Sequence, residues 1–466
     1  MEPSSKGALT LLQEMLESVN SKSLSGRTLS FVEQENESQA KGVDSVQMAF
    51  CFASFGYMVI WTGIGSRVTY YNEVYGPSFF VWLNIVFYVT GLPIAVLQKK
   101  CDNHVDGQLT TRASIRFRLL VCIIGMAVCA FILPFVDQRA FIGVVSLIGV
   151  FTWAIHGTIS KAAALVKYNA SIYQQVGFAL PGVTSIALLL ILTLFEREEL
   201  RNNFFYGTLS LMALLSLVGH AYILNNTHVL TVLDSKDEEY RISGYNQGGG
   251  DGCVVHSPVM DAEDNQATER MSLGEGGIEI GEQQVSTLQT NLLLPIGKDV
   301  EDSDYAHLLT IFITLFASVL QGSFISFVSS GNDFPVASAL YFTRLFADML
   351  GRPLALLHPS PACDTIEFLL GLAILRLLVC LVFFLYVFER GDDEVETDGA
   401  FVVMLQIIIS LSSGYIVASV YEKAAILSTS QQRNYRILAR MNLSFQSACA
   451  SSSLAAGLVL VAMAYS

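Results

Sequence analysis

Residues 334–357 read FPVASALYFTRLFADMLGRPLALL, an apolar stretch that carries Arg344, Asp348 and Arg352 at intervals of four residues. A membrane helix needs about 20 mostly apolar residues, because the hydrocarbon core is about 30 Å thick and each residue rises about 1.5 Å. Residues four apart lie on one helix face, so the three charges form a single stripe. Because exposing each charge to lipid costs about 2.5–3.5 kcal/mol, we expect the stripe to face the interior of a helical bundle.

Ten further apolar stretches of similar length accompany this one. They cover residues 46–66, 78–98, 117–136, 140–165, 172–195, 204–224, 307–329, 366–388, 400–421 and 443–465. The 466 residues are 52% hydrophobic and 15% charged, whereas a soluble domain carries about 25% charged residues. The net charge of -14 also argues against a nucleic-acid-binding protein, because phosphates require clustered Lys and Arg. The sequence therefore predicts an all-α polytopic membrane protein with 11 transmembrane helices.

A strongly acidic segment separates the sixth stretch from the seventh. Residues 234–304 contain 16 Asp or Glu and four Lys or Arg, and we expect them to form a disordered linker. The segment divides the chain into six spans and five, as in a two-bundle carrier of the major-facilitator type with its solute between the halves. The predicted domains are a polar segment (1–45), a six-helix bundle (46–224), an acidic loop (225–305) and a five-helix bundle (306–466).

Lys and Arg in short loops are retained on the cytosolic side of a membrane. They are concentrated in the loops after the second and tenth spans, which carry Lys99, Lys100 and Arg112, and Arg433 and Arg436, respectively. We therefore expect a cytosolic N-terminus and, with an odd number of spans, an extracellular C-terminus. The plasma membrane is the expected location.

Polar side chains inside the spans are candidates for solute contact. Asp348 can accept hydrogen bonds from a polar solute while Arg352, held by Asp348, donates to it; alternatively, the pair only fixes helix packing. His156 and Gln175 can pair with the edges of a heterocycle, or can bond to neighbouring helices, and His156 could also carry a proton. We expect gating or structural roles for Arg344, Arg376 and Lys161, with Lys161 able to extend to the cytosolic interface.

Several motifs of enzymes and motors are absent from the sequence. It contains no GxxxxGK[ST] phosphate loop, no GxSxG elbow and no HExxH helix, and its cysteines show no metal-ligand spacing. We therefore expect neither an enzyme nor a chain with a cofactor or metal.

Six short motifs occur in the order found in equilibrative nucleoside transporters, and over residues 46–465 the chain resembles that family. Asp348-Met349-Leu350-Gly351-Arg352 is similar to the family's Asp-x-x-Gly-Arg signature. The other landmarks are Gly63-Ile64-Gly65-Ser66, His156-Gly157-Thr158, Gln175, Arg376 and Ser413-Gly414-Tyr415. The chain departs from the family where Val68-Thr69-Tyr70-Tyr71 replaces Leu-Pro-Trp-Asn and where His156 replaces Gln. If the first span extends through Tyr71, as in the family, Arg67 is an intramembrane charge.

The resemblance implies uptake of purine or pyrimidine nucleosides, or of nucleobases, for purine salvage. Transport would be facilitated or coupled to protons, with the aspartate and arginine of the eighth span contacting the solute. On this interpretation the substrate-binding residues are Asp348, Arg352, His156, Gln175, Tyr70 and Trp61. The first bundle would rock against the second, which exposes the site to alternate sides of the membrane.

Two other functions agree with the same sequence. The chain could carry another small organic solute on the same scaffold. It could also be a non-transporting membrane sensor or scaffold whose acidic loop binds a partner.

Overall fold

The computed structural model describes residues 26–108, 110–166, 170–245, 299–328, 336–357, 365–389, 399–427 and 431–465. Every regular element within these ranges is a helix. Ten helical segments are long and apolar enough to cross a membrane, and they coincide with ten of the eleven predicted spans. The prediction of an all-helical integral membrane protein is therefore confirmed.

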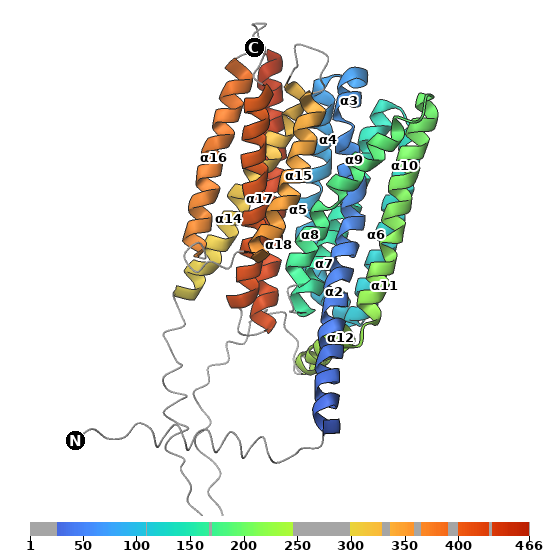
Figure 1. The fold of residues 1–466 in the computed structure, drawn as a ribbon, viewed down its shortest axis with the longest axis vertical. Helices are drawn as coiled ribbons and strands as arrows, with labels where there is room; N and C mark the ends of the chain where they lie inside the picture. Colours follow the sequence, from blue (N-terminus) through green and yellow to red (C-terminus); the bar gives the residue numbers. More distant parts are fainter. Residues whose placement is uncertain are drawn as a thin grey trace, which may run out of the picture.

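The first half of the chain forms the helices coloured blue to green in Figure 1. They are α2 (Gly26–Ser66), α3 (Val68–Tyr75), α4 (Pro77–Val89), α5 (Gly91–Gln108), α6 (Thr111–Ile132), α7 (Gln138–Val166), α8 (Ala170–Ala179), α9 (Pro181–Leu192), α10 (Glu198–Leu215), α11 (Leu217–Asn225) and α12 (Thr227–Tyr245), with a short 3-10 turn η1 (Leu133–Phe135). Some predicted spans consist of two successive helices. Pro181, for example, begins α9 because it cannot donate the backbone hydrogen bond that would continue α8.

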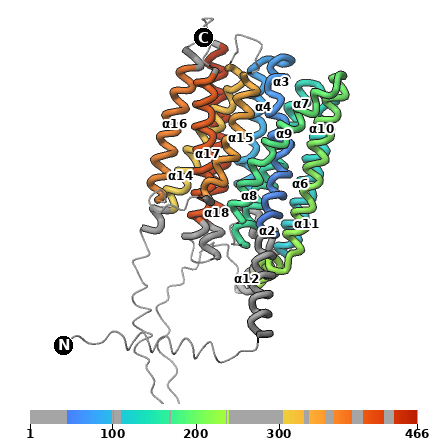
Figure 2. The backbone as a smooth tube through the Cα atoms, in the orientation of Figure 1, coloured from blue at the N-terminus to red at the C-terminus, as the bar shows by residue number. Residues whose placement is uncertain are grey.

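The second half forms the yellow to red helices, which lie beside the first half in Figures 1 and 2. They are α14 (Asp299–Ser323), the 3-10 turn η2 (Ile325–Phe327), α15 (Val336–Leu357), α16 (Ile366–Glu389), α17 (Gly399–Leu427) and α18 (Gln431–Tyr465). Below, the end of the bundle near α12 is called the α12 end, and the opposite end, near α3, the α3 end.

The eighth predicted span is α15, a helix of 22 residues. It differs from the ten apolar segments because it carries Arg344, Asp348 and Arg352. It packs most closely against α17 and also contacts α2, α3, α8 and α9 of the first half. A Cβ atom at Gly351 would overlap the backbone of Leu411, and one at Gly414 would overlap the backbone of Asp348. The two glycines thus allow α15 and α17 to approach closely at the level of the charged stripe.

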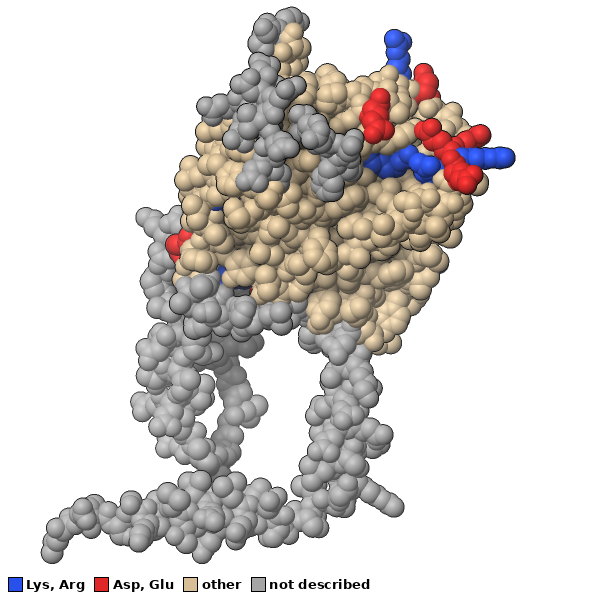
Figure 3. All heavy atoms as spheres, turned by 45° about the horizontal axis from the view of Figure 1, so that its top comes forward, with Lys and Arg blue, Asp and Glu red and all other residues tan. Residues whose placement is uncertain are grey.

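The surface of the bundle is that of a protein embedded in lipid. In the view of Figure 3, the visible charged side chains gather mainly at the rim of the α3 end, and the flank of the bundle is almost free of them. Large apolar side chains such as Phe117, Leu190 and Leu458 are exposed on the helices. A charge-free flank of this kind suits a hydrocarbon environment.

Two boundaries differ from the prediction. Helix α2 begins at Gly26, inside the predicted polar segment, and α12 extends to Tyr245, inside the predicted disordered linker. Asn226 stabilises the start of α12 by accepting hydrogen bonds from the backbone N–H groups of His228 and Val229 (3.0 and 3.4 Å), and Asp237 accepts one from Thr111 N (2.8 Å). Residues 1–25 and 246–298 of these two predicted segments lie outside the described ranges.

Candidate functional site

Arg352 joins the two halves of the molecule. Its side chain is almost completely buried, and its Nε and Nη2 atoms donate to Asp348 Oδ2 at 3.0 and 2.8 Å. Its Nη1 atom donates to the side-chain Oε1 (2.9 Å) and the backbone O (2.7 Å) of Gln175, which belongs to α8 in the first half. Three of the predicted substrate-binding residues are therefore brought together, by direct bonds.

Asp348 lines a cavity of about 100 Å³ between the two halves. Its side chain is 22% exposed, against 4% for Arg352. Both bonds from Arg352 go to Oδ2, and within the described residues no hydrogen bond to Oδ1 is found. A carboxylate has about four acceptor positions, so Asp348 can still accept hydrogen bonds from a solute.

Aromatic rings form much of the cavity wall. Trp61 stacks on Phe87 with ring centroids 3.9 Å apart, and its indole N–H donates to Tyr88 Oη at 3.2 Å. These contacts hold Trp61 beside the cavity, which it lines. Its role in solute binding stays a prediction. The aromatic residues that line the cavity are Trp61, Phe80, Tyr88, Phe178, Tyr341 and Phe445.

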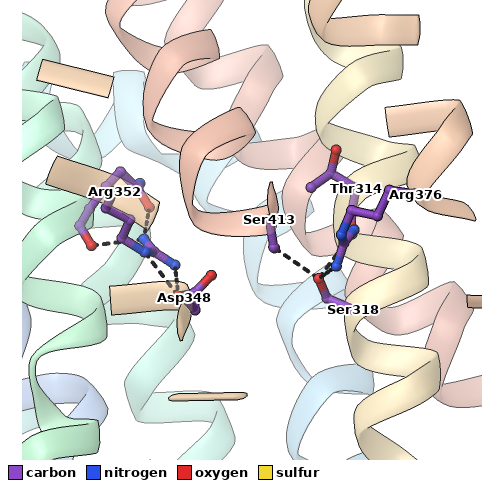
Figure 4. Close-up of polar contacts among 7 residues, drawn as sticks. Thr314, Ser318, Asp348, Arg352, Arg376 and Ser413 are labelled. Atoms are coloured by element: carbon purple, nitrogen blue, oxygen red, sulfur yellow. Dashed lines mark hydrogen bonds and ion pairs between the residues drawn. The ribbon is translucent and has the colours of Figure 1, made fainter. Parts of the chain in front are cut away.

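Arg376 enters the same cavity from α16. It is 3% exposed, and its three donor groups are bonded to Ile409 O (2.7 Å), Thr314 O and Ser318 Oγ. Ser318 is in turn bonded to Ser413 at 2.9 Å. Figure 4 shows this cluster facing the Asp348–Arg352 pair, with Ser413 between them. Arg376 thus joins α14, α16 and α17 through dipoles rather than through a carboxylate.

Arg344 lies one helical turn from Asp348 and also lines the cavity. Its guanidinium group packs over Gly322 of α14, where a Cβ atom would overlap it. The group also interacts with the hydroxyl of Tyr88. The three charges of the predicted stripe therefore all reach the space between the halves, which agrees with the expectation that they face the bundle interior.

His156 lies behind the cavity wall rather than in it. It is fully buried, its Nδ1 is bonded to the Tyr57 hydroxyl at 2.9 Å, and its ring packs against Phe178 and Phe445, with centroids 5.8 and 5.1 Å away. Both phenylalanines line the cavity, whereas His156 does not. Among the described residues, no hydrogen bond to its Nε2 is found, although the Asn442 side chain lies near the ring.

Tyr70 and Lys161 do not line the cavity beside Asp348 either. Tyr70 lines a separate pocket near the α3 end and stacks under Arg67, whose guanidinium carbon is 4.0 Å from the ring centroid. Arg67 lies at the break between α2 and α3, is 6% exposed and donates to Asn202 Oδ1 at 2.6 Å. It is therefore a buried charge. Lys161 is buried in α7 and does not extend to an exposed interface.

Sequence reasoning missed several residues of the cavity. Tyr341, Phe178 and Phe445 resemble ordinary apolar core residues, so their types give no signal. Ser318 and Gln321 were detectable, because they belong to a run of buried polar residues at helical spacing on α14 that begins with Thr310 and Thr314.

Comparison with solved structures identifies the fold. The major facilitator superfamily proton:xylose symporter XylE superposes with a TM-score of 0.53, and the alignment covers 89% of this chain and 88% of that one at 11% identity. A structure of a D-xylose–proton symporter gives a TM-score of 0.51, with 88% of each chain covered at 11% identity. The chain therefore has a fold like that of these major-facilitator transporters. No protein-family model and no curated protein matches the chain.

Proposed function

We propose that the chain is a secondary carrier that moves nucleosides or nucleobases across a membrane by alternating access. The observation that carries this proposal is the Asp348–Arg352 pair, which sits in an aromatic-lined cavity between the two halves while Arg352 bonds across to Gln175. A base offers an aromatic face together with donor and acceptor edges, which suits such a cavity. The motif resemblance to nucleoside transporters supports the solute class.

The size of the cavity indicates a closed conformation. Ligand pockets usually measure about 300–1,000 Å³, so a cavity of about 100 Å³ must enlarge before it holds a nucleoside. Contacts between the halves occur on both sides of it. Asn72 donates to Ser326 O at 3.0 Å near the α3 end, and Arg352 bonds to Gln175 on the side of α8. In the proposed cycle, one set of contacts opens at a time.

In the proposed cycle Asp348 and Arg352 bind the polar edge of the solute, and Trp61 supplies a stacking surface. His156 and Gln175 act from behind the wall: Gln175 positions Arg352, and His156 supports Phe178 and Phe445. Tyr70 is proposed as part of the entry path near the α3 end. We further propose a cytosolic N-terminus, an extracellular C-terminus and a plasma-membrane location, as the distribution of Lys and Arg predicts.

Uptake by purified protein in proteoliposomes tests the proposal. Radiolabelled uridine, adenosine, hypoxanthine and xylose are compared with and without a pH gradient. Xylose is included because both superposed structures are named as xylose symporters. Asp348→Ala should abolish uptake of the preferred solute. Uptake is normalised to the amount of folded protein, because removing one partner of the Asp348–Arg352 pair also lowers stability. Asp234→Ala, which removes an exposed carboxylate on α12, is the matched control and should leave uptake unchanged.

The alternative of a membrane scaffold is tested in the same system. Deletion of residues 245–295 should leave the flux of a carrier intact, whereas a scaffold would lose its partner. Wild-type uptake by Asp348→Ala would remove this residue from the proposed site. No uptake of any of the four solutes by the wild type would contradict the carrier proposal.

A further inference from the structure

The central cavity has an excess of positive charge. Arg344, Arg352 and Arg376 line it together with a single carboxylate, that of Asp348. Among the described residues, no other Lys, Arg, Asp or Glu lines it. Arginine stays protonated in proteins at all ordinary pH values. The cavity therefore holds three positive charges against one negative charge.

The bonds around each guanidinium group show which charge is already compensated. Asp348 is bonded directly to Arg352, so that pair is neutral as a unit. Arg376 is bonded to two carbonyls and a hydroxyl, which carry no net charge, and Asp348 is the only carboxylate among its charged neighbours. Arg344 interacts with the Tyr88 hydroxyl and lies near Tyr341 and Cys449, which are neutral groups. Within the described part of the chain, Arg344 and Arg376 thus have no carboxylate bonded to them, and the single charge of Asp348 is already paired with Arg352.

Uncompensated charge is costly in this place. A charged side chain inside a membrane protein normally pairs with another charge or faces water, because it loses its hydration in a medium of low dielectric constant. Arg376 is 3% exposed, so water reaches it poorly. A solute with one negative charge would reduce this excess from two positive charges to one on entering the cavity. A neutral solute would leave it unchanged.

On the basis of the proposed function, we propose that the carrier prefers an aromatic heterocycle that bears one negative charge, as a carboxylate or an ionised ring oxygen. The ring lies against the aromatic wall that includes Trp61, and the anionic group accepts hydrogen bonds from Arg344. Arginine suits this role because its planar fork of donors matches a carboxylate. Gly322 gives the Arg344 guanidinium room beside the cavity, since any larger residue there would overlap it.

Two solutes of nearly the same shape and different charge test the proposal. Orotate is uracil with a carboxylate, so proteoliposome uptake of radiolabelled orotate and uracil is measured over a range of concentrations. For the wild type we expect orotate to have a kcat/KM at least tenfold above that of uracil. Arg344→Leu should reduce the value for orotate at least tenfold and that for uracil less than threefold. Arg344→Lys, which keeps the charge, should recover part of the orotate uptake.

A second variant keeps the arginine but moves it. Gly322→Ala places a methyl group where the guanidinium lies, and the flexible Arg344 side chain can shift away, so the protein should fold. It should lower orotate uptake and spare uracil uptake. Gly371→Ala is the control, because a Cβ atom there meets nothing within 4 Å.

The outcomes separate this inference from the proposed function. Uptake of neutral bases or nucleosides with no uptake of orotate would overturn the preference for an anion and leave the carrier proposal standing. An equal loss of orotate and uracil in Arg344→Leu would show a structural role and would also overturn it. If no member of either solute set enters, both proposals fail.

Discussion

The close approach of α15 and α17 leads to a sharp prediction for Gly414→Ala. A Cβ atom at Gly414 would overlap the carbonyl oxygen of Asp348 and press on the N–H of Arg352. Both obstacles are backbone atoms, which cannot rotate aside as a side chain can. The two helices must therefore separate, or one must bend.

Two opposing terms give the magnitude. Replacing glycine by alanine inside a helix stabilises it by about 1 kcal/mol. Overpacking of a tight contact costs about 1–3 kcal/mol, and we expect the upper end of that range because the contact is with backbone. The free energy of unfolding should then fall by about 2 kcal/mol in Gly414→Ala.

Gly371→Ala on α16 isolates the packing term. Its Cβ atom meets nothing within 4 Å, so this variant should gain only the helix-propensity term. The propensity terms cancel between the two variants, and their difference of about 3 kcal/mol is the cost of overpacking alone. Thermal unfolding of both proteins in the same detergent, followed by fluorescence-detected size exclusion, measures the order of their midpoints. A midpoint for Gly414→Ala at or above that of Gly371→Ala would refute the close helix contact.

Two further variants distinguish Arg352 from Arg376, the two buried arginines of the central cavity. Arg352→Met leaves the Asp348 carboxylate without its partner, and because breaking a buried ion pair costs about 3–5 kcal/mol, we expect a clear drop in the unfolding midpoint. Arg376→Met removes a buried cation that has no carboxylate bonded to it, so the midpoint should stay within the equivalent of about 1 kcal/mol of the wild type while uptake falls at least tenfold. Unfolding midpoints and uptake rates measured on the same preparations check both predictions. A large drop of the midpoint in Arg376→Met, or no drop in Arg352→Met, would contradict the assignment of Asp348 as the partner of Arg352 alone.

The sequence was sufficient for the positions of the spans but not for their internal breaks. Length and hydropathy locate ten of the spans because the bilayer requires long apolar helices whatever their neighbours are. The same argument located α15 in spite of its charges, since only a bundle interior tolerates Arg344, Asp348 and Arg352 on one face. Breaks such as that at Arg67 depend on tertiary partners, here Asn202 and Tyr70, and hydropathy does not report these.

Only part of the candidate site could be predicted from the sequence. The i,i+4 spacing predicts the bond between Asp348 and Arg352, because both side chains belong to one helix. Gln175 was predicted as a separate solute contact, and its bond to Arg352 was not predicted, since no local rule connects α8 with α15. Tyr70 was assigned to the site through that same resemblance, but its side chain faces Arg67 in another pocket. The sequence shows how far along a span a residue lies, whereas packing against other helices decides which neighbours its side chain contacts.

Gln175 receives two bonds from a single nitrogen of Arg352, one to its side chain and one to its own main chain. Because both acceptors belong to one residue, a small displacement of α8 from α15 breaks both hydrogen bonds together. The bonds are not lost one after the other. A contact of this kind is therefore either fully formed or fully broken. In the proposed cycle, this end of the bundle would therefore switch between two discrete positions, and intermediates with partial opening would be short-lived.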